Sequence, residues 1–130
     1  MVILDTDHMS LLEWENTPAA PQLERRLDRL PAEEIATTIV NFEEQVRGWM
    51  ATLAKAKRLV EQIPVYDRLV GQLRIYCALK ILSFDENAAV QFQALRKSKL
   101  RLGTMDLKIA AIALSRQATL LWPTAKVLLH

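Results

Sequence analysis

The sequence predicts an α/β fold, a three-layer α/β/α sandwich with a central parallel sheet of about four strands. Short apolar or β-branched runs alternate along the chain with longer stretches whose apolar residues recur every three or four positions. Alternation of strands and helices favours a parallel sheet with helices on both faces. The low content of turn residues, 3 Gly and 5 Pro, favours long helices over a β-sandwich.

The length and composition set the bounds on this fold. A chain of 130 residues is long enough for one core and too short for two, so we expect a single domain, residues 1–130. The net charge of +2 is too small to indicate a nucleic-acid partner by itself. One cysteine, Cys77, excludes an intramolecular disulfide, and no apolar stretch reaches membrane-spanning length. We therefore expect a cytoplasmic protein without a membrane partner.

Four apolar runs are the expected strands. The first is wholly apolar, as in buried parallel strands, and the second is rich in β-branched residues. The four runs are residues 2–4, 35–40, 81–84 and 118–122.

Helical spacing of apolar residues marks the segments around these strands. Asp7, Asn41 and Asp85 precede three of them as candidate caps, and Pro64 should kink or divide a fourth. The expected helices are residues 8–15, 22–30, 41–54 and 59–79, a helix after Asp85, and residues 105–116.

Acidic residues lie where a parallel sheet would bring them together. Asp5 ends the first strand, Glu44 opens the helix after the second, and Asp106 opens the helix before the fourth. Ligands of open α/β sheets bind at the carboxyl ends of the strands. Each residue also has a purely structural explanation, because acidic side chains cap helices and favour their first turns. Three of them at three separate element ends favour a shared site.

Helix geometry decides which acidic residues can face that site. Glu43 and Glu44 are adjacent, so only one of them can point toward it. Glu44 lies four residues before Gly48, which would allow another backbone to approach closely, so we expect Glu44 to point inward. Asp106 shares a helix face with Ile109 and two alanines that can pack onto a sheet.

Clustered carboxylates raise one another's pKa unless a hard cation holds them together. Oxygen ligands suit Mg²⁺ or Mn²⁺, and such sites typically activate water and stabilise the leaving oxygen in phosphoryl chemistry. We therefore expect Asp5, Glu44 and Asp106 to be metal-binding catalytic residues. Thr6 or Thr104 could support them by hydrogen bonding to a carboxylate or to a metal-bound water.

Four segments, VILDTDHMSLL, TTIVNFEEQVRGW, ILSFDENAAVQF and LGTMDLKIAAIAL, resemble the successive signature blocks of PIN-domain ribonucleases. The resemblance is closest to VapC-type toxins of bacterial type II toxin–antitoxin modules and extends from Met1 to about Leu121. It implies a PIN-like, metal-dependent endoribonuclease that hydrolyses RNA phosphodiester bonds, with acidic ligands at Asp5, Glu44 and Asp106. It also implies a homodimer and a small, VapB-like antitoxin protein that occupies the active-site groove.

The resemblance fails near the end of the sequence. Family members usually place an Asn or Asp after the last of these strands, as a fourth polar position of the site, and then a further strand. Here ATLL is followed by WPTAKVLLH, and no acidic residue follows Asp106. We therefore expect the C-terminal strand to be lost or altered, as a frameshift in the gene would explain. A catalytically impaired PIN scaffold that binds RNA or antitoxin remains an alternative.

A basic segment precedes the helix that begins near Asp106. Arg96, Lys97, Lys99 and Arg101 could meet RNA phosphates, or could be a solvated helix end that the helix dipole favours. A remote alternative is a haloacid-dehalogenase-type phosphatase, because the first strand is followed by two aspartates at the nucleophile–acid spacing of that class.

The apolar content also bears on assembly. The chain has more apolar residues than one small sheet needs to cover it, among them Trp14, Val65, Leu69, Ile75 and Tyr76. We expect part of this surface to be exposed in the monomer and covered by a partner, which favours a homodimer.

Overall fold

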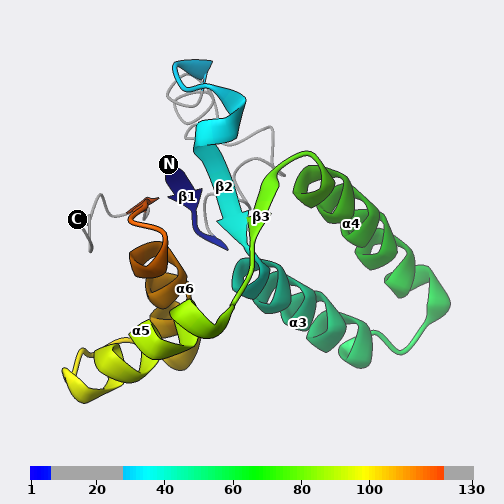
Figure 1. The fold of residues 1–130 in the computed structure, drawn as a ribbon. Helices are drawn as coiled ribbons and strands as arrows, with labels where there is room; N and C mark the ends of the chain where they lie inside the picture. The colour runs from blue at the N-terminus through cyan, green and yellow to red at the C-terminus, as the bar shows by residue number, and fades with distance from the viewer. Residues whose placement is uncertain (7–27, 122–130) are drawn as a thin grey trace.

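The computed structural model describes residues 1–6 and 28–121, which form a parallel sheet covered by helices (Figure 1). The sheet has the strand order β3-β2-β1-β4, and every neighbouring pair is parallel. Ile3 at the centre lies in register with Ala36 on one side and Leu120 on the other. The strands are β1 (Val2–Leu4), β2 (Ile35–Thr38), β3 (Lys80–Leu82) and β4 (Thr119–Leu121).

Helices connect these strands and cover the sheet. The pair α3 and α4 follows β2, whereas α5 and α6 follow β3 and lie apart from that pair in Figure 1. The helices are η1 (Ala32–Glu34, a 3-10 turn), α3 (Ile39–Lys55), α4 (Leu59–Cys77), α5 (Glu86–Lys97) and α6 (Thr104–Ser115). None of the helices in the described residues is long and apolar enough to cross a membrane.

Side-chain alternation along β1 builds two cores. Ile3 belongs to a buried cluster with Ile109 and Ile112 of α6. Leu4 points to the other face and packs with Tyr76 of α4. Both β1 residues have no exposed surface, as expected for a central parallel strand. The predicted α/β/α sandwich with a four-stranded parallel sheet is therefore confirmed.

The boundary between β2 and α3 lies earlier than predicted. The expected strand over residues 35–40 ends at Thr38, and the helix begins at Ile39, not after Asn41. Thr38 is the N-cap: its Oγ1 accepts a hydrogen bond from the Asn41 backbone N–H at 3.1 Å. Asn41 is the third helical residue, and its side chain accepts a hydrogen bond from the Thr38 backbone N–H in return. This capping box satisfies the helix start and outweighs the β propensity of Ile39 and Val40.

Other boundaries also differ from the prediction. Pro64 neither divides nor ends α4, which runs unbroken from Leu59 to Cys77. Because Pro64 is the sixth helical residue, it removes one backbone hydrogen bond near the solvent-exposed start of the helix. The third strand begins one residue earlier and ends two residues earlier than predicted, at Leu82, and the fourth begins one residue later than predicted, at Thr119.

The apolar residues expected to be exposed lie mainly inside the protein. Val65 and Tyr76 are buried, and Leu69 and Ile75 are half-buried, because they form the face of α4 that packs inward. A different face of α4 is exposed and includes Cys77. The predicted helix over residues 8–15, most of the one over 22–30, Trp14, and the C-terminal segment after residue 121 lie outside the described residues.

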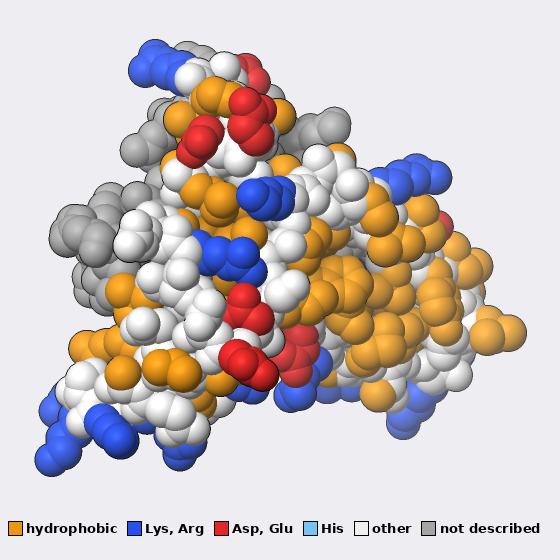
Figure 2. Space-filling view, in the orientation of Figure 1, with side chains coloured by type: hydrophobic (Ala, Val, Ile, Leu, Met, Phe, Trp, Pro, Cys, Tyr) orange, Lys and Arg blue, Asp and Glu red, His pale blue; other side chains and the backbone are white. Residues whose placement is uncertain are grey.

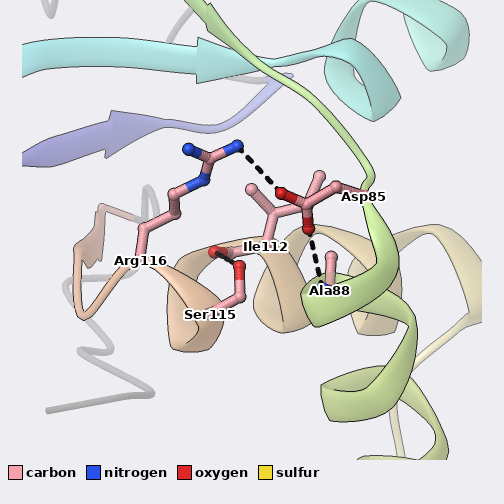
Figure 3. Close-up of polar contacts among 5 residues, drawn as sticks. All are labelled: Asp85, Ala88, Ile112, Ser115 and Arg116. Atoms are coloured by element: carbon pink, nitrogen blue, oxygen red, sulfur yellow. Dashed lines mark hydrogen bonds and ion pairs between the residues drawn. The ribbon is translucent and has the colours of Figure 1, made fainter.

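Asp85 caps α5, as the sequence predicted (Figure 3). Its Oδ1 accepts a hydrogen bond from the Ala88 backbone N–H at 3.0 Å. Its Oδ2 lies 3.5 Å from Nη2 of Arg116, directly after α6, so the same carboxylate joins the start of α5 to the end of α6. The ion pair is partly exposed, so most of its contribution to stability should come from the cap.

We predict that Asp85→Ala lowers the free energy of unfolding by about 1 kcal/mol, because α5 loses its cap. Asp85→Asn keeps a capping oxygen and loses only the charge, so it should cost a few tenths of a kcal/mol. Urea denaturation measures both values, with Gln93→Ala on the exposed face of α5 as the control. Equal losses for Asp85→Ala and Asp85→Asn would show that the ion pair, and not the cap, dominates.

Candidate active site

The carboxyl ends of the strands hold a cavity of about 230 Å³. It is lined by Asp5, Thr6, Glu44, Asp106 and Ile109. The three carboxylates come from three separate segments: the end of β1, the second turn of α3 and the first turn of α6. The strand order reverses at β1, between β2 and β4, which is where open α/β sheets bind ligands. The structure thus brings together the three acidic residues that the sequence singled out.

The two adjacent glutamates of α3 have different surroundings, because one of them forms an ion pair within the helix. Glu43 Oε2 lies 2.7 Å from Nη2 of Arg47, one turn further along the helix surface. Glu44 points about 100° away from this pair and lines the cavity. The close approach of another backbone at Gly48, which the sequence led us to expect, is wrong. Gly48 is exposed, and a Cβ built there would meet no atom within 4 Å. The start of α3 at Ile39 sets the direction of Glu44, and close packing at Gly48 has no part in it.

Asp106 lies at the rim of the cavity. The residue itself is exposed, whereas Ile109, one turn later, is only 2% exposed and closes the cavity from α6. Residues 109–113 are all buried, so α6 is held against the sheet and α5 along its middle. Its first turn is thereby fixed beside the end of β1. Asp106 was expected to lie on the buried face of this helix. It lies on the same side of α6 as Ile109, but its own side chain is exposed to solvent.

A buried polar network, missed from sequence, ties β1 to α3. The Asn41 Nδ2 donates to Thr6 Oγ1 at 3.1 Å, and the Asn41 Oδ1 accepts from both the backbone N–H and the hydroxyl of Thr38. Thr37 Oγ1 donates to the Leu4 carbonyl oxygen at 3.0 Å. Asn41, Thr37 and Thr38 have no exposed surface. From the sequence, Asn41 was expected only to cap a helix, although two threonines before it, inside an otherwise apolar strand, are the signal of a buried network.

The donor set suits a hydrated divalent cation. No three acidic, histidine or cysteine side chains in the described part of the chain are arranged to ligate one ion together. However, Mg²⁺ usually keeps several waters and takes only one or two protein carboxylates directly. The cavity has room for several waters, and its charged lining consists of carboxylates alone. Asp5, Glu44 and Asp106 therefore fit Mg²⁺ or Mn²⁺ held partly through water.

The remaining predicted site residues lie outside this cavity. Thr104, the first residue of α6, is exposed and does not line it, whereas Thr6 does. The basic residues are exposed at the far end of α5 and in the loop that leads to α6, where Figure 2 shows Lys and Arg side chains gathered. They are Arg96, Lys97, Lys99 and Arg101.

The protein belongs to the PIN domain family, whose family model matches residues 2–124. This assignment leaves no place for the phosphatase alternative. No curated protein matches the chain significantly in sequence.

Several solved structures share the fold. VapBC-1 from nontypeable Haemophilus influenzae has 20% sequence identity and a TM-score of 0.70, over 95% of this chain and 87% of that chain. DNA-bound VapBC from Salmonella typhimurium has 19% identity and a TM-score of 0.70, over 92% and 83%. VapC20 from Mycobacterium tuberculosis, a toxin that cleaves the sarcin-ricin loop, has 10% identity and a TM-score of 0.59, over 92% and 85%. At these identities the likeness shows the fold alone.

We predict that Asn41→Ala lowers the free energy of unfolding by about 2 kcal/mol, because the buried Thr38 loses the acceptor of its backbone N–H and hydroxyl and Thr6 loses the donor from Asn41. Thr6→Val, which removes only the acceptor of the Asn41 amide, should cost about 1 kcal/mol. Thr52→Val is the matched control, because the Thr52 hydroxyl bonds to its own helix on an exposed surface. Urea denaturation gives the three values, and an Asn41→Ala loss no larger than that of the control would contradict the assigned role of the network.

Proposed function

We propose that this protein is a divalent-metal-dependent endoribonuclease, the toxin of a toxin–antitoxin module. One observation carries the proposal: in a PIN-domain chain, Asp5, Glu44 and Asp106 from three separate segments line one cavity at the carboxyl edge of the sheet. Structural capping explains a single acidic residue, but it does not explain why three of them converge on one cavity. The structural neighbour VapC20, a toxin that cleaves the sarcin-ricin loop, supports RNA as the substrate class.

The roles of the three carboxylates follow from their positions. Asp5 and Glu44 are half-buried on the inner side of the cavity, and Asp106 lies at its open rim. Together they would hold Mg²⁺ or Mn²⁺, directly or through water, and orient a water molecule toward an RNA phosphodiester. Bound there, the cation supplies charge neutralisation for the phosphate and lowers the pKa of water. Thr6 supports the inner wall, because its hydroxyl accepts a hydrogen bond from the buried Asn41.

RNA would reach the cavity along the basic segment. Arg101 is exposed and lies five residues before Asp106, so a strand bound at its phosphates by this segment would pass close to the rim. Arg96 also lies over the ring of Phe92, with its guanidinium carbon 5.7 Å from the ring centroid, which holds that cation at the helix end. We assign phosphate binding to Arg96, Lys97, Lys99 and Arg101.

The proposed protein partners follow from the proposal that the chain is a toxin. Structural neighbours include a toxin–antitoxin complex from Klebsiella pneumoniae and VapBC and FitAB structures bound to DNA, so we propose a small VapB-like antitoxin for this chain. We also propose a homodimer in the cytoplasm. The alternative, a PIN scaffold that binds without cleaving, is favoured by the segment WPTAKVLLH, which follows ATLL where the resembled family usually has an Asn or Asp.

We predict that Asp106→Asn lowers metal-dependent RNA cleavage by more than about a hundredfold, because the transition state loses several kcal/mol of stabilisation. The stability of the protein should be unchanged or slightly higher, because repulsion within the cavity falls. Glu43→Gln, a neighbouring carboxylate engaged by Arg47, is the matched control and should retain activity. Cleavage is measured with Mg²⁺ or Mn²⁺ and with chelator. Full activity of Asp106→Asn would refute the assignment, and a wild type without metal-dependent cleavage would favour the scaffold.

We predict that replacing Lys97, Lys99 and Arg101 together by Gln weakens RNA binding and flattens its dependence on salt. Each lost phosphate contact should lower the slope of log K against log salt by roughly one. Lys55→Gln with Lys57→Gln, which replaces two exposed cations at the far end of α3, is the control. An unchanged salt slope in the triple variant, measured by fluorescence anisotropy, would show that this segment is only a solvated helix end.

A further inference from the structure

The side-chain amide of Asn41 is held in one orientation by its neighbours. Its Oδ1 accepts hydrogen bonds from the Thr38 backbone N–H at 3.2 Å and from the Thr38 hydroxyl at 2.6 Å. A backbone N–H can only donate, so the end of the amide that faces Thr38 must be the oxygen. The Thr38 hydroxyl in turn accepts from the Asn41 backbone N–H at 3.1 Å, so its own hydrogen is directed to the amide oxygen. The amide nitrogen therefore faces Thr6.

This orientation fixes the role of the Thr6 hydroxyl. The Asn41 Nδ2 donates to Thr6 Oγ1 at 3.1 Å, so the hydroxyl is an acceptor on the side of the protein interior. A hydroxyl that accepts from one partner still has one hydrogen to donate, and here that hydrogen must go to an acceptor other than Asn41. Asn41 and Thr38 have no exposed surface, so solvent does not reverse this chain of hydrogen bonds. Thr6 is therefore held as a donor where it lines the cavity.

Thr6 differs in this respect from the other residues that line the cavity. The carboxylates of Asp5, Glu44 and Asp106 are acceptors when ionised, and Ile109 is apolar. Among the lining side chains that the structure describes, Thr6 alone can donate a hydrogen bond to a bound anion.

We propose that Thr6 is a phosphate-binding residue, whose hydroxyl donates to a non-bridging oxygen of the RNA phosphate, and that Asn41 is its positioning residue. This inference rests on the proposed function, in which the carboxylates hold a cation beside the phosphate. A water that attacks the phosphate must lose a proton, so it needs an acceptor, and the carboxylates supply one. The phosphate oxygens need donors, and hydrogen bonds to charged oxygens are the stronger kind. The carboxylates cannot supply such a donor, whereas Thr6 can.

The competing acceptor for the Thr6 hydrogen is one of the cavity carboxylates. In that case the hydroxyl would orient a ligand of the cation, and its removal would weaken cation binding. A hydroxyl that serves the phosphate gives the opposite result, because its removal weakens phosphate binding and leaves cation binding unchanged. The two assignments are therefore separated by measuring the two affinities independently.

Two calorimetric titrations of the full chain make these measurements. The first adds Mg²⁺, and the second adds inorganic phosphate to the Mg²⁺-saturated protein. Thr6→Ser retains the hydroxyl, so we expect its phosphate affinity to stay within about threefold of wild type. Thr6→Val keeps the shape without the donor, so phosphate should bind at least about tenfold more weakly, with Mg²⁺ affinity unchanged within about threefold.

Asn41→Ala tests the positioning role, because Thr6 keeps its hydroxyl but loses the donor that directs it. Phosphate should bind at least about threefold more weakly to this variant. Adding Asn41→Ala to Thr6→Val should change phosphate affinity by less than about twofold, because Asn41 acts on phosphate only through Thr6. Tyr76→Phe is the matched control. It removes another buried hydrogen bond, from the Tyr76 hydroxyl to Gln45 Oε1 between α4 and α3, so it should lose stability in urea and keep wild-type phosphate affinity.

The results distinguish a failure of this inference from a failure of the proposed function. A folded wild type that binds no Mg²⁺ would refute the cation site, and the phosphate role with it. If wild type binds Mg²⁺, then equal phosphate affinity in Thr6→Val and Thr6→Ser, or no phosphate binding, would overturn the role of Thr6 alone. Lower Mg²⁺ affinity in Thr6→Val with unchanged phosphate affinity would assign the hydroxyl to a carboxylate instead. Additive losses in the double variant would overturn the positioning role of Asn41.

Discussion

The hydrogen bonds of the Asn41 side chain hold together the three parts of the chain on which the rest depends. They close the N-terminus of α3 through Thr38, fix the helix start at Ile39, and reach across to Thr6 beyond β1. Because the helix start is fixed, Glu44 points to the cavity and Glu43 points to Arg47. A shift of one residue at this cap would turn α3 by about 100° and replace one glutamate by the other.

The apolar packing of α6 places Asp106 at the cavity. The middle of α6 is almost wholly apolar and small, so it lies close against both the sheet and α5, and its first turn is placed at the carboxyl edge of β1. Asp5 is brought there by the strand itself, since the parallel pairs on both sides of β1 align the strand ends. Three carboxylates in one small cavity are mutually repulsive, and the fold holds them there through hydrogen bonds and apolar packing elsewhere. The proposed cation site rests on this arrangement, because oxygen ligands suit Mg²⁺ or Mn²⁺.

The sequence predicted the order and type of most described elements and the three cavity carboxylates, because both depend on simple periodicity and on the rule that parallel strands share a carboxyl edge. It failed where a local hydrogen bond competes with propensity. Ile39 and Val40 favour a strand, yet the Thr38 cap makes them helical. Pro64 was expected to kink or divide α4, but the helix runs unbroken through it, and near the helix start the proline removes only one hydrogen bond. The exposure of Cys77 could not be predicted either, because α4 is apolar on two faces and only tertiary packing decides which face is buried.

We propose that Asp5, Glu44 and Asp106 form one divalent-cation site. Calorimetric titration of Mn²⁺ into the protein without RNA tests it most directly, because cation binding needs neither substrate nor catalysis. We expect saturable binding in wild type and in Glu43→Gln, with binding at least about tenfold weaker in Asp5→Asn and in Asp106→Asn. Equal Mn²⁺ affinity in all four proteins, or no binding by the folded wild type, would contradict it.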